Sequence, residues 1–169
     1  MTTGAARWLA PLVVAWALLG PLGILVRALR HLAPSALAAV AEVDRPSRAL
    51  SLLLACGLMA WLEGYRGFQR RAVPRMVHVA FAVPDAPAWK QLLAPLIALD
   101  LVGVPRARLM RRWLLVGGII ALIRLVRALP DGIRDQVNAA VFTGLAWGLV
   151  ALLIETLSRV ATPRAAVAP

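Results

Sequence analysis

The side chains that could do chemistry in this sequence are polar groups placed inside long apolar runs. Arg124 and Asp100 each lie within such a run, and Asn138 lies near the start of another. A polar group at membrane depth is costly, so each is a candidate intramembrane site, and together they would suit a small channel or carrier for anions. The structural alternative is that Arg124, like Arg127, lies close enough to the end of its run for the guanidinium to reach the interface.

Catalytic and metal-binding motifs are absent from the sequence, which has no glycine-rich phosphate loop, serine nucleophile elbow or paired-carboxylate motif. Cys56 is the only cysteine, so there is no internal disulfide and no cysteine-based metal cluster. His31 and His78 flank the second predicted span and cannot share a metal. Glu63 and Glu155 are expected to pair with nearby arginines rather than to relay protons. We therefore predict no catalytic residue, no metal and no cofactor. A bound lipid is expected, and a pigment in an apolar groove would need no motif.

The composition is typical of an integral membrane protein. Of the 169 residues, 61% are hydrophobic, and the mean hydropathy is +0.77; a soluble domain has about 45–50% apolar residues. The excess is gathered in runs of the length that crosses about 30 Å of hydrocarbon as an α-helix. The sequence predicts an all-α membrane protein, with one helical bundle over residues 1–160 and a frayed tail over residues 161–169.

Four apolar runs predict transmembrane helices, and a fifth segment is ambiguous. The predicted spans cover about residues 8–28, 47–65, 112–129 and 136–156. Residues 27–48 are expected to form a connector with a short helix in its middle, and Pro74 is expected to end the helix that follows. Residues 86–104 contain Pro95 and Asp100, so this segment is either an interfacial or re-entrant helix or a further crossing.

The distribution of positive charge favours four crossings. If residues 86–104 do not cross, 12 Lys and Arg lie on the side of the termini and six on the other side; if they cross, the counts become eight and 10. Cytoplasmic loops carry the excess of positive charge, so four spans with both termini cytoplasmic are predicted, and five spans are the alternative. On this interpretation, membrane topology and attraction to anionic lipid headgroups explain the net charge of +11, and nucleic-acid binding is not predicted.

The densest positive charge lies between the second and third predicted spans. Guanidinium groups there are candidates for binding lipid headgroups or an acidic partner surface. The predicted set consists of Arg66, Arg70, Arg71, Arg75, Arg106, Arg108, Arg111 and Arg112.

Two stripes of small residues recur at four-residue spacing on predicted helices. Such stripes allow helices to approach closely in lipid, where packing drives association. The predicted packing residues are Cys56, Ala60 and Gly64 on one span and Ala140, Gly144 and Gly148 on another.

Three segments resemble an uncharacterised group of small multi-pass bacterial inner-membrane proteins. They are Leu62–Arg71 with the following Pro74-Arg75, then Leu92–Pro95, and Gly144–Leu149. The resemblance implies a bacterial inner-membrane location and carries no activity or site residues.

These features favour a non-catalytic membrane subunit or an assembly factor of a larger respiratory or photosynthetic complex, with lipids and other membrane subunits as partners. A small channel or carrier using Arg124 is the alternative. A lipid-modifying enzyme is disfavoured because the sequence offers no convergent acid, base or metal groups.

Overall fold

The computed structural model describes residues 4–99, 101–102 and 106–162, and this part of the chain is helical with no strand. The predicted all-α class is confirmed. Long helices form α1 (Gly4–Ala41), α6 (Arg106–Arg127) and α7 (Asp131–Ala161). Another unbroken pass combines α2 (Pro46–Met59), the π-helix η1 (Ala60–Ala72) and α3 (Val73–Ala82).

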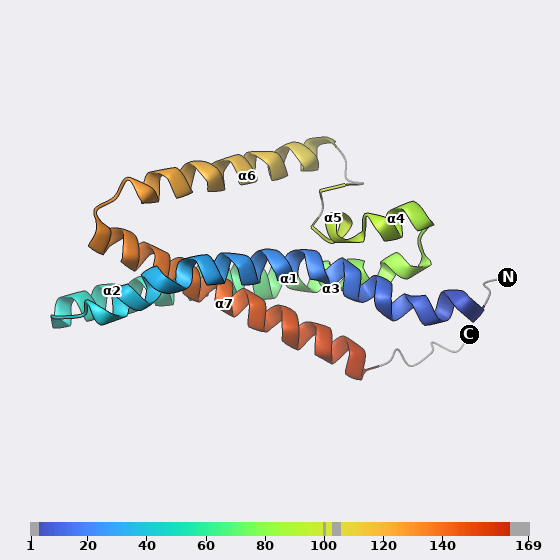
Figure 1. Ribbon diagram of the computed structural model, residues 1–169, viewed down its shortest axis with the longest axis horizontal. Helices are drawn as coiled ribbons and strands as arrows, with labels where there is room; N and C mark the ends of the chain where they lie inside the picture. The colour runs from blue at the N-terminus through green and yellow to red at the C-terminus, as the bar shows by residue number, and fades with distance from the viewer. Residues whose placement is uncertain (1–3, 100, 103–105, 163–169) are drawn as a thin grey trace.

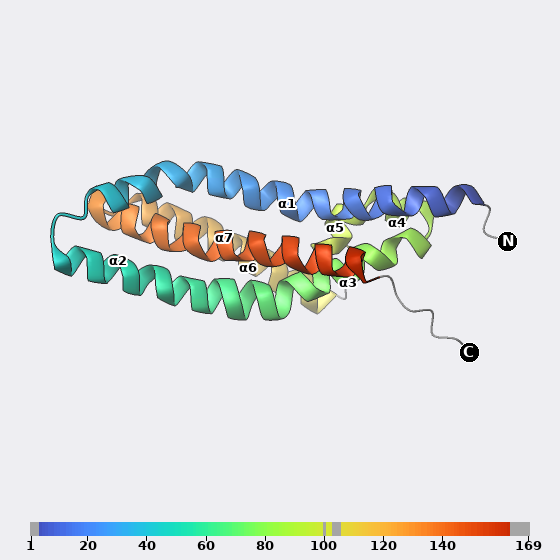
Figure 2. The same cartoon turned by 90° about the horizontal axis from the view of Figure 1, so that it is seen from below.

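The long passes run alternately in opposite directions, so α1 begins and α7 ends at the same end of the molecule (Figures 1 and 2). Between α3 and α6 lie three short elements, namely η2 (Val83–Asp85), α4 (Ala88–Leu92) and α5 (Ala94–Ala98). Each of these is five residues or fewer, which is too short to cross a bilayer. Asp100 lies outside the described residues.

The predicted connector over residues 27–48 is wrong, because α1 continues through most of it. Only residues 42–45 are outside a helix. The stretch is rich in alanine, which has the highest helix propensity, and Ala36 and Ala39 pack against Leu52 of α2 and Ala139 of α7. Tertiary packing on this turn keeps the chain helical past Pro34.

Pro74 does not end the second pass as expected. It is the second residue of α3, two residues after η1 ends, where the backbone hydrogen bonds change from the π to the α pattern. A residue without an N–H is tolerated in the first turn of an α-helical segment, so the helix continues as α3.

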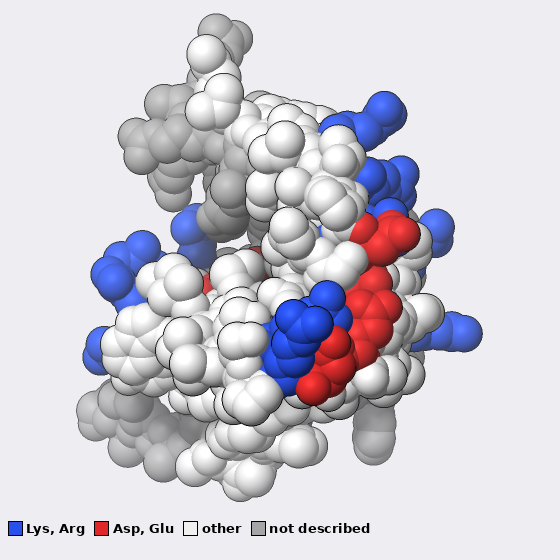
Figure 3. Space-filling model, turned by 90° about the vertical axis from the view of Figure 1, so that its left-hand side faces the viewer, with Lys and Arg blue, Asp and Glu red and all other residues white. Residues whose placement is uncertain are grey.

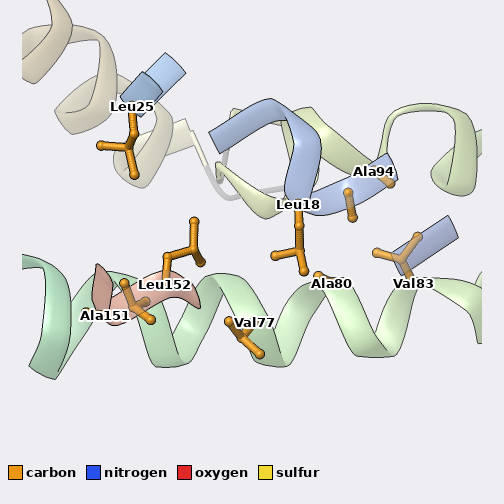
Figure 4. Packing of buried hydrophobic residues seen from close by; sticks show 10 residues of the cluster. Leu18, Leu25, Val77, Ala80, Val83, Ala94, Ala151 and Leu152 are labelled. Atoms are coloured by element: carbon orange, nitrogen blue, oxygen red, sulfur yellow. The ribbon is translucent and has the colours of Figure 1, made fainter. Parts of the chain in front are cut away.

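The core lies between α1, α3 and α7 and is built from small and medium side chains (Figure 4). Leu18 of α1 faces Val77 and Ala80 of α3, and Leu25 lies above Ala151 of α7. The largest fully buried side chains are Val73 and Val77. Small side chains at these positions bring the helix backbones close together.

The short helices α4 and α5 are held against the first half of α1. A Cβ placed on Gly20 would lie 2.7 Å from Cβ of Pro95, so the glycine leaves room for α5. Trp16 Nε1 donates a hydrogen bond to the carbonyl oxygen of Leu92 at 3.1 Å, and Ala94 is fully buried. This segment therefore packs along the bundle.

Within the described part of the chain, two helices are long and apolar enough to cross a membrane, on length and composition alone. They are Leu9–Ala41, with 33 residues, and Asp131–Ala161, with 31 residues.

The apolar runs of α1 and α2 lie at different heights in the bundle. Leu18 and Leu25 are level with α3 and the second half of α7, whereas Leu52 of α2 packs against Ala39, close to the other end of α1. The predicted spans 8–28 and 47–65 are therefore staggered, which charge counting did not anticipate. Between the two clusters, the exposed side chains of α1 include Arg27, Arg30 and His31.

Candidate functional site: the junction of the π-helix with helix α7

The segment Ala60–Ala72 forms a π-helix, in which each backbone N–H bonds five residues back. At its end, the N–H of Val73 donates to the carbonyl oxygen of Phe68. π-Helical segments are rare and occur frequently at functional sites. The segment contains Gly64 and Gly67, and glycine weakens the competing α-helix. This segment is therefore the candidate site.

Burial along the second pass follows the wider π turn. Gly64 and Val73 are both buried, and they are nine residues apart. At 3.6 residues per turn, nine residues make about two and a half turns, so an α-helix would place the two on opposite faces. The π-helix has more residues per turn, at roughly 4.4, and returns Val73 to the side of Gly64. The π form is thus what turns both residues toward α7.

The contact between η1 and α7 pairs a glycine of each helix with an aromatic ring of the other. A Cβ on Gly64 would lie 2.8 Å from Cβ and Cγ of Trp147, and a Cβ on Gly148 would lie 2.6 Å from Cγ of Phe68. Neither glycine can therefore carry a side chain without displacing the other helix.

A third close approach involves Gly144 of α7. A Cβ at this position would lie 3.2 Å from the carbonyl oxygen of Met59 and 3.3 Å from Oε2 of Glu63. Three close approaches therefore join α7 to the end of α2 and to the π-helix, within about one turn of α7 between Gly144 and Gly148.

The predicted small-residue stripes face each other within the chain. Gly64, Gly144 and Gly148 form the contact just described, and Ala140 is also buried. The remaining members are half-buried, and Cys56 packs beside Leu52 in the second hydrophobic cluster. The stripes are therefore used in folding this chain, so they are not free to receive a partner helix.

A hydrogen bond between side chains closes the junction. The indole Nε1 of Trp147 donates to Oε1 of Gln69 at 2.8 Å. Sequence reasoning singled out neither Gln69 nor the ring of Phe68 as a packing residue. The available signal was the five-residue interval from Gly64 to Gln69, which is one turn of a π-helix but not of an α-helix.

A groove of about 490 Å³ runs beside this junction, between α7 and the segment from η1 to α3. On α7 it extends from Thr143 to Glu155, a distance of about 18 Å at 1.5 Å per residue. Its walls are mainly apolar. The lining residues are Gln69, Val73, Thr143, Ala146, Trp147, Val150, Ala151, Ile154 and Glu155.

The two carboxylates near the junction differ in their partners. Glu155 accepts from Arg159 Nε at 3.3 Å, one helical turn away, as the sequence predicted. Glu63 is half-buried against Gly144, and no Lys or Arg nitrogen of the described residues lies within ion-pair distance of it. The expected ion pair of Glu63 is therefore not formed within the described part of the chain, because the arginines of η1 are exposed.

The predicted headgroup-binding arginines are exposed where their side chains are described, namely Arg66, Arg70, Arg71 and Arg75. Arg70 lies over the ring of Tyr65 at 5.6 Å from its centroid, and that ring stacks on Trp61 at 5.0 Å. The side chains of Arg106, Arg108, Arg111 and Arg112 lie outside the description.

The predicted intramembrane polar site is not assembled by its two described members. Arg124 is exposed on α6, whereas Asn138 is half-buried on α7. Neither residue lines the groove or the second cavity described below. Asp100, the third member, lies outside the described residues.

A second, polar cavity of about 290 Å³ lies at the opposite end of the bundle, where α1, α2 and α7 have their ends. Acidic and basic side chains are intermixed on this end (Figure 3). Arg48 pairs with Asp44 at 3.4 Å and Arg134 with Asp131 at 2.7 Å. The lining residues are Ala39, Glu42, Arg48, Pro130, Gly132, Ile133 and Gln136.

Among the described residues, no three His, Cys, Asp or Glu side chains are grouped so that they could hold a metal ion. In comparisons with known proteins, no family model, no curated protein and no solved structure matches this chain. The resemblance to small bacterial inner-membrane proteins therefore receives no support from them, and the functional argument depends on the geometry.

Proposed function

We propose that this protein is a non-catalytic integral membrane subunit or assembly factor of a larger complex. The observation that carries the proposal is the exposure of α6. Every described side chain of this helix is exposed except Val126, which is half-buried. Exposed fractions reach 79% for Leu114 and 64% for Leu125.

The exposed side chains of α6 point in all directions around its axis. Ile120, Leu122, Ile123 and Leu125 fall on every side of a helix with 3.6 residues per turn, and each is exposed. Between Trp113 and Ile123 this helix has no charged residue, and a helical stretch that is apolar all round is buried in protein or in a membrane. In Figure 1, α6 stands apart from the bundle formed by α1, α3 and α7. This arrangement supports a helix whose packing partners are lipids and another protein chain.

The rest of the exposed apolar surface supports a membrane environment. Leu53 and Leu54 of α2 are 70% and 64% exposed, and Leu12 and Ile24 of α1 are 64% and 58% exposed. Large apolar side chains exposed on several helices are typical of a surface that contacts lipid or another protein. We infer a bacterial cytoplasmic membrane protein with four crossings, both termini in the cytoplasm, and the arginines of η1 at anionic headgroups.

The channel or carrier reading requires polar groups that converge on an interior path. Arg124 lies on the exposed helix, which favours a guanidinium that reaches the interface. The subunit reading needs no such path. A respiratory or photosynthetic complex is the proposed host, because such complexes contain small subunits without catalytic groups.

The test compares one exposed leucine on α6 with one on α2. Purification from the native membrane in mild detergent, followed by mass spectrometry, should recover a stoichiometric partner with the unmodified chain. Leu114→Glu should release that partner, and Leu53→Glu, at a comparably exposed position, should retain it. A chain that purifies alone, or loses its partner equally in both variants, would contradict docking through α6.

A further inference from the structure

The groove beside the π-helix has an outer wall that is apolar and uncovered. Trp147, Val150 and Ile154 are 45%, 54% and 60% exposed. Its floor contains Val73 and Ala151, which are buried. A linear apolar ligand lying in the groove would pack against this wall, since packing and not the exclusion of water drives such contacts in lipid.

The dimensions of the groove fit a linear ligand. Its length along α7, about 18 Å, is close to the depth of one leaflet of a bilayer core about 30 Å thick. It runs along the helix axis, as the acyl chains of a membrane do. At the end near Thr143, the indole N–H of Trp147 donates to Oε1 of Gln69, so this donor is not presented unpaired to a hydrocarbon tail.

The other end of the groove carries one negative and one positive group. The carboxylate of Glu155 lines the groove, and Arg159 Nε lies 3.3 Å from its Oε1. This end of α7 lies at the end of the molecule where α1 begins. A headgroup that contains both a phosphate and a primary ammonium matches this pair, because Arg159 can receive the phosphate and Glu155 the ammonium.

We propose that the groove binds one acyl chain of a zwitterionic phospholipid with a primary-ammonium headgroup. The phosphate lies at Arg159 and the ammonium at Glu155. The π form of η1 is required, because it turns Gln69 and Val73 toward α7 and so forms the second wall. This inference assumes the membrane location proposed above and does not depend on the partner complex.

The experiment is native mass spectrometry of the isolated full-length chain in detergent, titrated with three phospholipids of identical acyl chains. Their headgroups are ethanolamine, choline and glycerol. We expect one ethanolamine lipid per chain, bound about two- to fivefold more tightly than the others, as for an exposed ion pair. Glu155→Gln should abolish the preference for ethanolamine over choline, and Arg159→Gln should weaken the binding of all three.

The groove itself is tested by a larger side chain. Ala146→Phe should remove stoichiometric binding, and Ala121→Phe, on the exposed helix α6, should not. Circular dichroism checks that both variants remain helical. If Ala146→Phe does not fold, the Glu155→Gln variant still tests the preference for the ethanolamine headgroup.

Three results would overturn the proposal. They are equal binding of the three lipids by the unmodified chain, tighter binding of the anionic glycerol lipid, and full binding by a helical Ala146→Phe variant. No partner is present in this lipid-binding assay, so a negative result would not contradict the subunit proposal. Failure to find a partner complex would likewise not contradict a positive lipid-binding result.

Discussion

The indole of Trp147 and the amide of Gln69, 78 residues apart in sequence, share a hydrogen bond of 2.8 Å across the junction of α7 with the π-helix. Together with the glycine contacts on either side, this hydrogen bond holds the π-helix η1 against α7. The π-helix is therefore stabilised by tertiary contacts and not by its own sequence alone.

Trp147→Phe removes this hydrogen bond and keeps an aromatic ring beside Gly64. We expect a loss of about 1 kcal/mol in the free energy of unfolding, the usual value for one side-chain hydrogen bond between helices. Unfolding by increasing fractions of denaturing detergent measures the change. Trp113→Phe, at an exposed position on α6, is the control and should be neutral. Equal losses in both variants would show that the bond is not a specific contribution.

Gly148→Leu places a side chain where the ring of Phe68 lies 2.6 Å from an added Cβ. Overpacking of this kind should destabilise the bundle by about 1–3 kcal/mol. Gly57→Leu is the matched control, since no atom lies within 4 Å of its added Cβ and leucine favours the helix more than glycine does. The comparison uses the same unfolding assay. A stable Gly148→Leu variant would show that α7 and η1 do not pack as described.

Gly20→Leu should detach α5 from α1, because the new side chain would collide with Pro95. The bundle of long helices should survive, while the backbone amides of α5 exchange with solvent at least tenfold faster in hydrogen–deuterium exchange. Gly23→Leu lies one turn along the same helix with nothing within 4 Å of its added Cβ, and it should leave exchange unchanged. Unchanged exchange in both variants would refute docking at this glycine.

The topology can be read from two engineered cysteines in a Cys56→Ser background, since Cys56 is the only native thiol. Val43→Cys, between α1 and α2, should react with a membrane-impermeant thiol reagent only from the non-cytoplasmic side. Ser158→Cys, near the end of α7, should react only from the cytoplasmic side. Labelling of both from one side would rule out the proposed four crossings.

The sequence predicted the helical class, because hydropathy and helix propensity act locally. The interfacial or re-entrant placement of residues 86–104 stays a prediction. The sequence did not predict the length of α1, since Arg27 marks the end of the predicted span, whereas helix propensity and the packing of Ala36 and Ala39 continue the helix past it. The same local reasoning assigned Glu63 an arginine partner that the described residues do not supply.

The π-helix and the groove could not be predicted from local patterns. The π form depends on contacts between residues about 80 positions apart, such as Gly64 with Trp147 and Phe68 with Gly148. The sequence predicted that the small-residue stripes are packing surfaces. Their spacing does not indicate whether the helix that packs against each stripe belongs to this chain or to a partner. Only the fold supplies that information.

The length of α1 has a consequence for the bilayer around it. A helix of 38 residues is about 57 Å long, whereas a bilayer with its headgroups is about 40–45 Å thick. If α1 crosses the membrane as proposed, it must either extend about 12 Å or more into water or tilt by about 40°, at the upper limit for transmembrane helices. Hydrophobic mismatch would then vary with lipid composition, so thicker membranes would hold the molecule more upright and thinner ones would incline it further.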